Sequence, residues 1–100
     1  AISRSLSLYP KSADAALVDE IVQRSAAVFR QSSGFRSCTT SVDALMGPGA
    51  KSGEVGRLVF VDFDTLEDAL GALQSEDFED VRTASEQLSP THYLFECRDV

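Results

Sequence analysis

The residues from Leu58 to Phe63 read Leu-Val-Phe-Val-Asp-Phe and form the strongest strand signal in the chain. Successive side chains of a strand point to opposite faces of a sheet. Here both sets are apolar, with Val59, Val61 and Phe63 on one face and Leu58 and Phe60 on the other. Such a strand has to be covered on both sides. The strand expected over residues 54–63 therefore lies at the centre of a sheet.

Three weaker strands are expected around this one. Ile2, Leu6 and Leu8 alternate with serines, which is the period-two pattern of a strand with two unlike faces. The stretch Cys38–Leu45 is rich in Thr, Ser and Val but only half apolar, so it predicts an edge strand, followed by a loop over Met46–Gly53. The last strand is expected over residues 91–98.

Apolar residues at helical spacing predict the helices between these strands. A stripe from Leu17 to Phe29, preceded by the two capping residue types Ser12 and Asp14, indicates a helix of about seventeen residues that is closed at Gly34. Asp64 followed by Glu67, or Thr65 followed by Asp68, has the spacing of a capping box and starts a second helix, and Ser75 caps a third that continues to Pro90. The order is β-α-β-β-α-α-β.

This order is typical of an α+β, ferredoxin-like domain, here one domain over residues 1–100, with a four-stranded antiparallel sheet and helices on one face. Right-handed crossovers place the first and third strands at the centre and the second and fourth outside. The helices can cover only one face of the sheet. Because the other face is also apolar, we expect a homodimer packed sheet to sheet.

Composition excludes several classes of function. The 100 residues contain 9 basic and 16 acidic side chains, a net charge of −7, which opposes binding to nucleic acid. An RNA-binding protein of the same plan is disfavoured further, because the central strands lack basic and aromatic recognition residues. The longest apolar run, Leu58–Val61, is far too short to cross a membrane. With no leader pattern, the expected location is the cytoplasm.

The two cysteines indicate neither a disulfide nor a metal site. Cys38 and Cys97 have no CxxC spacing, and the expected strand order places them on opposite edges about 14 Å apart, too far for a bond within the chain. His92 is the only histidine, so the clustered ligands that zinc requires are missing. We expect no metal and no cofactor.

Three residues are candidates for chemistry or binding. His92 is the only side chain that normally titrates near neutral pH, so it is the catalytic candidate, although a lone histidine on an edge strand is also typical of a structural role. Tyr9 can place a phenol at a cavity or pack on the sheet. Arg4 interrupts an apolar strand face, where it can bind an acidic ligand or extend to the rim.

Several of these segments resemble the EthD family of dimeric α/β-barrel proteins. The segments are Leu8–Pro10, Ser33–Phe35 after a long helix, Leu58–Leu70 and Ser75–Asp77. The antibiotic-biosynthesis monooxygenase family shares much of this pattern. The resemblance implies two ferredoxin-like subunits whose sheets close into an eight-stranded barrel. It also implies binding of small, often aromatic or polyketide-like molecules, which some members oxidise, cyclise or decarboxylate without metal or flavin.

One position departs from the family pattern. EthD-like sequences commonly carry a histidine nine residues before the glycine of the turn, and Ser25 stands there in this chain. A serine does not titrate near neutral pH, so acid or base chemistry at this position is lost. Ser25 lies on the helix stripe, where it can bind a ligand or donate back to its own helix.

Two functions are consistent with these observations. The first is a small dimeric α/β-barrel protein that resembles EthD, binds a small apolar or aromatic compound and acts in its oxidation or degradation without a cofactor. The alternative is a non-catalytic dimeric binding or regulatory module, since a fold does not fix a function. The sequence leaves open whether the chain is an enzyme.

Overall fold

The computed structural model describes residues 1–42 and 54–100. The chain runs through β1 (Ile2–Pro10), α1 (Ala15–Phe29), β2 (Phe35–Thr40), β3 (Val55–Phe63), α2 (Leu66–Leu73), the short 3₁₀ helix η1 (Glu76–Phe78), α3 (Glu79–Glu86) and β4 (Thr91–Cys97). The predicted order of elements is confirmed.

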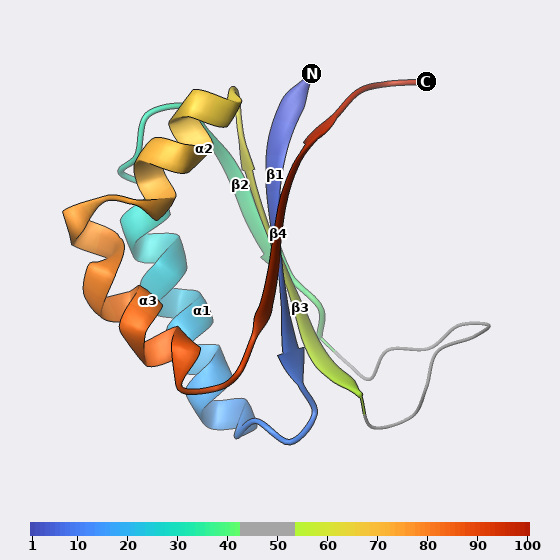
Figure 1. Ribbon diagram of the computed structural model, residues 1–100, viewed down its shortest axis with the longest axis vertical. Coiled ribbons are helices and arrows are strands. Elements are labelled where there is room, and N and C mark those ends of the chain that lie inside the picture. Colours follow the sequence, from blue (N-terminus) through green and yellow to red (C-terminus); the bar gives the residue numbers. More distant parts are fainter. Residues whose placement is uncertain (43–53) are drawn as a thin grey trace.

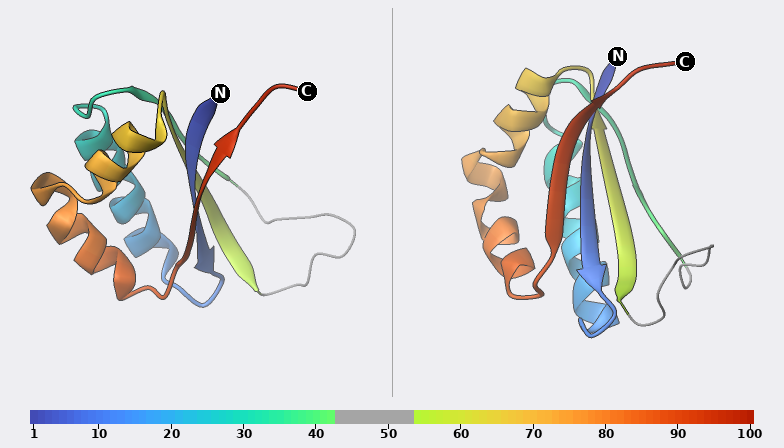
Figure 2. Two further views of the ribbon diagram at one scale, coloured as in Figure 1. Left: turned by 45° about the horizontal axis from the view of Figure 1, so that its top comes forward. Right: turned by 45° about the vertical axis from the view of Figure 1, so that its right-hand side comes forward.

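The four strands form one antiparallel sheet in the order β2-β3-β1-β4. The helices lie together on one face of this sheet, and the views in Figures 1 and 2 agree on this arrangement. The predicted α+β, ferredoxin-like fold is confirmed, including the central position of the first and third strands. None of the helices within residues 1–42 and 54–100 is long and apolar enough to cross a bilayer.

The second strand differs from its prediction. We expected a strand over Cys38–Leu45, but β2 begins at Phe35 and ends at Thr40. Its pairing with β3 explains the early start, because Phe35 already lies opposite Phe63. Residues 43–45 and the predicted loop Met46–Gly53 lie outside the described residues, which resume at position 54.

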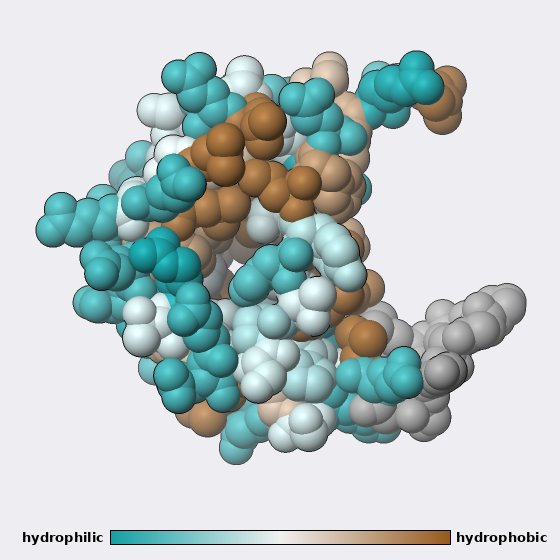
Figure 3. All heavy atoms as spheres, in the orientation of Figure 1, coloured by the Kyte–Doolittle hydropathy of each residue, from teal (hydrophilic) through white to brown (hydrophobic). Residues whose placement is uncertain are grey.

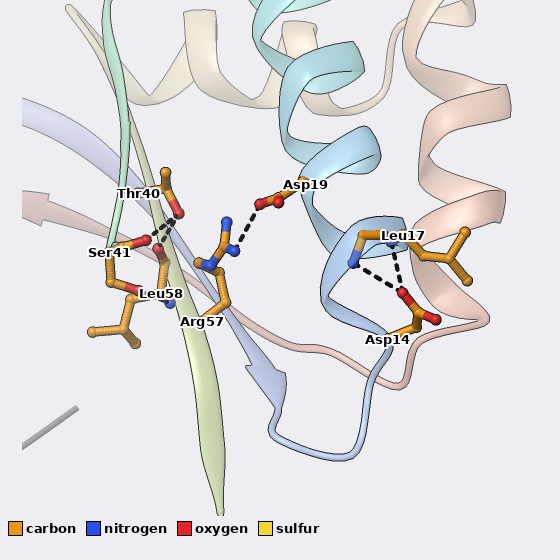
Figure 4. A network of polar contacts seen from close by, with 8 residues as sticks. Asp14, Leu17, Asp19, Thr40, Ser41, Arg57 and Leu58 are labelled. Carbon is orange, nitrogen blue, oxygen red and sulfur yellow. Dashed lines mark hydrogen bonds and ion pairs between the residues drawn. The ribbon is translucent and has the colours of Figure 1, made fainter. Parts of the chain in front are cut away.

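Polar contacts fix the start of α1 and connect it to the sheet, as Figure 4 shows. One carboxylate oxygen of Asp14 accepts from the backbone N–H groups of Ala16 at 2.9 Å and Leu17 at 3.2 Å, so the predicted cap is confirmed. Arg57 on β3 pairs with Asp19 on α1 at 2.7 Å. The ion pair between Arg57 and Asp19 connects α1 to the sheet.

The turn after α1 contains a glycine that no other residue can replace without strain. Gly34 has φ of 73°, and a Cβ at this position would overlap the carboxylate of Asp68 at the start of α2. The helix ends at Phe29, with Arg30 as its C-cap. Gly34 is therefore the left-handed residue of the turn that follows, and does not cap the helix itself. The turn after α1 therefore packs directly against the start of α2.

The core lies between the helices and the inner face of the sheet. Phe63 is completely buried, and its ring meets that of Phe29 edge to face at a centroid distance of 5.8 Å. Phe29 also packs on Phe78 of η1 at 4.6 Å. Val59 and Val61 line the same face of β3 and are buried. This face is therefore the one that the helices cover.

The opposite face of the sheet, which we call the outer face, is apolar and has no described helix on it. The pairing register places Leu6 beside Phe60 and Tyr93, and Arg4 beside Phe95. Tyr93 is 54% exposed and Phe95 is 38% exposed. Of the two apolar faces predicted for β3, the one that contains Phe60 is thus left uncovered.

The edge strands carry the two cysteines. Cys38 lies on β2 and Cys97 on β4, at opposite edges of the sheet, and both are free thiols. The prediction that they do not form a disulfide within the chain is confirmed.

Candidate functional site

A cavity of about 230 Å³ lies between the inner face of the sheet and the helices. Figure 3 shows a hollow between the helices and β4, with apolar residues gathered above it over α2. The cavity has an apolar wall and a polar mouth. Its lining residues are Ser7, Tyr9, Val22, Ser25, Phe29, Val59, Val61, Leu73, Phe78, Arg82, Ser85, Glu86 and His92.

Small side chains from three elements leave this space open. Ser7 on β1, Ser25 on α1 and Ser85 on α3 all line the cavity, where a packed core normally carries larger residues. Ser25 and Ser85 are buried, with 8% and 4% of their surface exposed. Because their neighbours are held in a sheet and in helices, the chain cannot easily collapse into the space that these serines leave.

Ser7 and His92 form a hydrogen-bonded pair at the mouth. They lie directly opposite each other where β1 pairs with β4, and Ser7 Oγ is 2.7 Å from His92 Nδ1. Loss of hydration against the cavity lowers the pKa of His92, and the nearby carboxylate of Glu86 opposes this shift. The imidazole is therefore neutral at neutral pH, the form that can accept a proton.

Tyr9 and Ser85 form a second pair, deeper in the cavity. The two hydroxyl oxygens are 2.6 Å apart, and both side chains are buried. Burial raises the pKa of the Tyr9 phenol, and the hydrogen bond to Ser85 partly opposes this. The phenol therefore keeps its proton. Two hydroxyls hold two hydrogens and their mutual bond uses one, so the pair has a hydrogen to offer a ligand.

Two charged residues complete the lining on α3. Arg82 donates from Nη1 to the backbone carbonyl of Leu73 at 2.7 Å, which ties α3 to the end of α2. Glu86 lies one turn further along the same helix and is exposed. On this side of the cavity, the polar part of a bound molecule would contact one positively and one negatively charged side chain.

The structure brings three of the four predicted site residues together. Tyr9, Ser25 and His92 all line the cavity. Arg4 does not, because its side chain lies on the outer face, where Nε and Nη2 donate to the two carboxylate oxygens of Asp62 at 2.7 and 2.9 Å. Its guanidinium also lies over the Phe60 ring, 5.4 Å from the centroid. The functional roles of these four residues remain predictions.

Four polar lining residues were missed by the sequence interpretation: Ser7, Arg82, Ser85 and Glu86. The alternation in β1 already places Ser7 on the same face as Tyr9. The missing information was the register between β1 and β4, which joins residues 85 positions apart. Within residues 1–42 and 54–100, no three His, Cys, Asp or Glu side chains lie close enough together to hold a metal ion.

Comparison with solved structures gives matches over nearly the whole chain. The cofactor-independent oxygenase SnoaB from Streptomyces nogalater superposes with a TM-score of 0.74 at 19% identity, covering 99% of this chain and 94% of its own. An EthD family protein from Bacillus halodurans has a TM-score of 0.73 at 16% identity, covering 98% and 100%. The fold is ferredoxin-like. The resemblance to EthD proteins is thus confirmed as a structural similarity.

Two further matches extend this comparison. A putative antibiotic biosynthesis monooxygenase from Bordetella bronchiseptica gives a TM-score of 0.70 at 15% identity, covering 97% of this chain and 96% of its own. A dimeric ferredoxin-like protein of unknown function from Thermobifida fusca gives 0.71 at 11% identity, covering 96% and 91%. No protein-family model matches the chain, and no curated protein matches its sequence. At these identities the similarity establishes the fold and not the activity.

Proposed function

We propose that this protein binds a small apolar or aromatic compound in the cavity between its sheet and helices and removes a proton from it during a cofactor-free oxidation or breakdown. The observation that carries this proposal is the position of His92, which lies at the mouth of a cavity whose wall is largely apolar. Apolar cavities with a few convergent polar groups are typical binding sites.

The size of the cavity indicates the size of the ligand. An engineered apolar cavity of about 150 Å³ is large enough for benzene. The cavity here measures about 230 Å³ and is open on one side, so one or two fused rings fit inside. Phe29 and Phe78 provide aromatic surface against which such a ring can pack. Larger compounds would extend through the mouth past His92 and Glu86.

The polar groups suit a ligand with a weakly acidic hydrogen. A neutral imidazole accepts a proton from a phenol or an activated C–H group, and the Tyr9–Ser85 pair can donate to the oxygen on which negative charge develops. In an oxidation without a cofactor the compound itself supplies the electrons to dioxygen, and loss of a proton makes these electrons easier to remove. SnoaB, which has the same fold, is described as a cofactor-independent oxygenase.

We further propose that the protein works as a homodimer joined through the outer face. Tyr93 and Phe95 are large and exposed there, beside the Arg4–Asp62 ion pair, and exposed apolar side chains of this size are typical of an interface. The Thermobifida fusca protein of similar fold is described as dimeric. The cavity opens on the other side of the sheet, so dimerisation leaves its mouth accessible.

A non-catalytic binding module is the second candidate, and Ser25 favours it. This residue lines the cavity at the position where EthD-like sequences commonly carry a histidine, and its hydroxyl cannot serve as a base at neutral pH. The same cavity would then bind its ligand without converting it.

Thermal unfolding with a panel of one-ring and two-ring phenols tests the binding proposal. A ligand present at 100 times its dissociation constant stabilises the folded state by about 2.7 kcal/mol, which raises Tm measurably. Ser25→Phe fills the cavity and should abolish the rise. Leu17→Phe adds the same ring at an exposed site outside the cavity and should preserve it. If no phenol raises Tm, the binding proposal is wrong.

Oxygen uptake and product analysis with the phenol that raises Tm most then distinguish the enzyme from the non-catalytic binding module. We expect turnover in the wild type and loss of turnover in His92→Ala, with binding retained. Binding without turnover in the wild type would favour the module. Turnover that survives in His92→Ala would assign the base to another residue.

A further inference from the structure

The pair formed by Ser7 and His92 has a second chemical capacity that proton removal from a ligand does not use. A serine hydroxyl within hydrogen-bond reach of a neutral imidazole is the arrangement of an activated nucleophile. We infer that Ser7 attacks the carbonyl carbon of small carboxylic esters bound in the cavity and is acylated there, with His92 as its base. This esterase activity is distinct from the oxidation proposed above, although it takes place in the same cavity.

The backbone holds the two side chains in place. Ser7 lies on a central strand, opposite His92 on one side and Val59 on the other, so hydrogen-bonded ladders fix its position from both sides. The distance of 2.7 Å between Ser7 Oγ and His92 Nδ1 is within the range that proton transfer requires. Sites built on strands keep such distances better than sites built on loops.

The other cavity residues provide what an ester needs. Val22, Phe29 and Phe78 form an apolar wall for a short acyl chain or a ring. Tyr9 follows Ser7 by two residues on the same face of β1, and its pair with Ser85 can donate one hydrogen bond to the carbonyl oxygen as it becomes negative. His92 lies at the mouth, where the departing alcohol can leave.

The reaction balances with water as the only co-reactant. Ser7 Oγ forms a bond to the ester carbonyl carbon while its proton moves to His92 Nδ1. The bond from this carbon to the alkoxy oxygen then breaks, and the proton passes from His92 to the departing alcohol. Water cleaves the acyl-serine by the same route, which releases the carboxylic acid and restores the Ser7 hydroxyl.

Two probes test this activity on the intact chain. A fluorophosphonate should add once to the wild type, and peptide mass spectrometry should place the adduct on Ser7. The protein should also hydrolyse p-nitrophenyl butyrate with an initial burst of p-nitrophenol. Ser7→Ala should abolish both signals. His92→Ala should slow labelling at least about 100-fold, which is the lower range for loss of a general base.

Ser5→Ala is the matched control, because Ser5 lies on the same face of β1 two residues earlier and is buried. It should label at the wild-type rate. Circular dichroism and thermal unfolding show whether each variant is folded. An adduct on any residue other than Ser7, or labelling of Ser7 that is as fast in folded His92→Ala, would overturn the inference, and so would failure of the folded wild type to label at all. Failure to label leaves the phenol-binding experiment unaffected, so the two proposals fail separately.

Discussion

The two faces of the sheet differ in a way that reverses the usual arrangement on β1. Toward the helices this strand presents Ser3 and Ser5, which are buried, whereas Leu6 and Leu8 point to the outer face. A strand that packs only against helices normally has the opposite pattern. We infer from this difference that the two faces of the sheet serve different purposes. On the inner face Ser7 continues this row of serines and lines the cavity, whereas large apolar residues make the outer face suitable for association.

The largest expected effect comes from the aromatic core of the inner face. Phe63→Ala removes a completely buried ring that packs against Phe29 and Phe35, and should lower the free energy of unfolding by roughly 3–5 kcal/mol. Phe95→Ala on the outer face removes a ring that is 38% exposed in a single subunit. Urea unfolding at low protein concentration should show a much smaller loss for Phe95→Ala. Equal losses would mean that the faces do not differ as described.

A charge on the outer face should have the next largest effect. This effect is on dimerisation and not on folding. Leu8→Asp places a carboxylate on this face, next to Leu58 and two positions along β1 from Leu6. An unpaired charge buried in an interface weakens binding by at least about 2 kcal/mol, close to a 30-fold rise in the dissociation constant. Analytical ultracentrifugation measures this change. Leu17→Asp on α1 is the control, and its dimer should be as stable as that of the wild type.

Removal of one hydroxyl inside the cavity should have a smaller effect. Tyr9→Phe leaves the buried Ser85 hydroxyl without its partner at 2.6 Å and should cost about 1–2 kcal/mol of unfolding free energy. The double variant Tyr9→Phe/Ser85→Ala removes both groups and should recover part of this loss. Thermal and urea unfolding of the four proteins in this cycle give the coupling directly. An additive cycle would mean that the hydrogen bond contributes nothing.

The smallest expected effect is the pH dependence that His92 contributes. Its pKa in the folded protein lies below the ordinary value of 6.5, so the unfolded chain binds more protons in the interval between the two values. The stabilisation is therefore present above pH 6.5 and is lost as the pH falls through the lowered pKa. NMR titration of the imidazole should give a midpoint below 6.5.

His92→Gln provides the comparison for this pH effect. The difference in unfolding free energy between wild type and variant should change with pH only across that interval. Glu86 and Arg82 line the same cavity and are present in both proteins, so their contributions cancel to first order. A midpoint above 6.5 would contradict the loss of hydration that lowers the pKa of the ring.

Most of the fold could be predicted from local patterns. The two apolar faces around Val59 and Phe60 predicted a central strand, and the alternation of serine and leucine predicted a strand with unlike faces. β2 was predicted less well, because its start depends on pairing across the sheet with Phe63 and not on its own residues. Strand ends that are set by a partner strand leave little trace in the local sequence.

The candidate site was harder to predict for the same reason. Tyr9, Ser25 and His92 were selected one at a time by residue type or family resemblance, and only the register between β1 and β4 shows that His92 lies beside Ser7. Arg4 was selected by its interruption of an apolar strand, yet that pattern does not distinguish a ligand contact from an ion pair with Asp62. Pairing between distant segments decided both cases.

The serines that line the cavity have a consequence for how ligand preference can evolve. Ser7, Ser25 and Ser85 come from three separate elements, and the side-chain hydrogen bonds of Ser7 and Ser85 are made to other side chains and not to the backbone. An exchange of one of them for alanine, threonine or valine changes the shape of the cavity by one or two atoms while the backbone stays where it is. Single amino-acid substitutions at these positions can therefore change which compound the cavity binds.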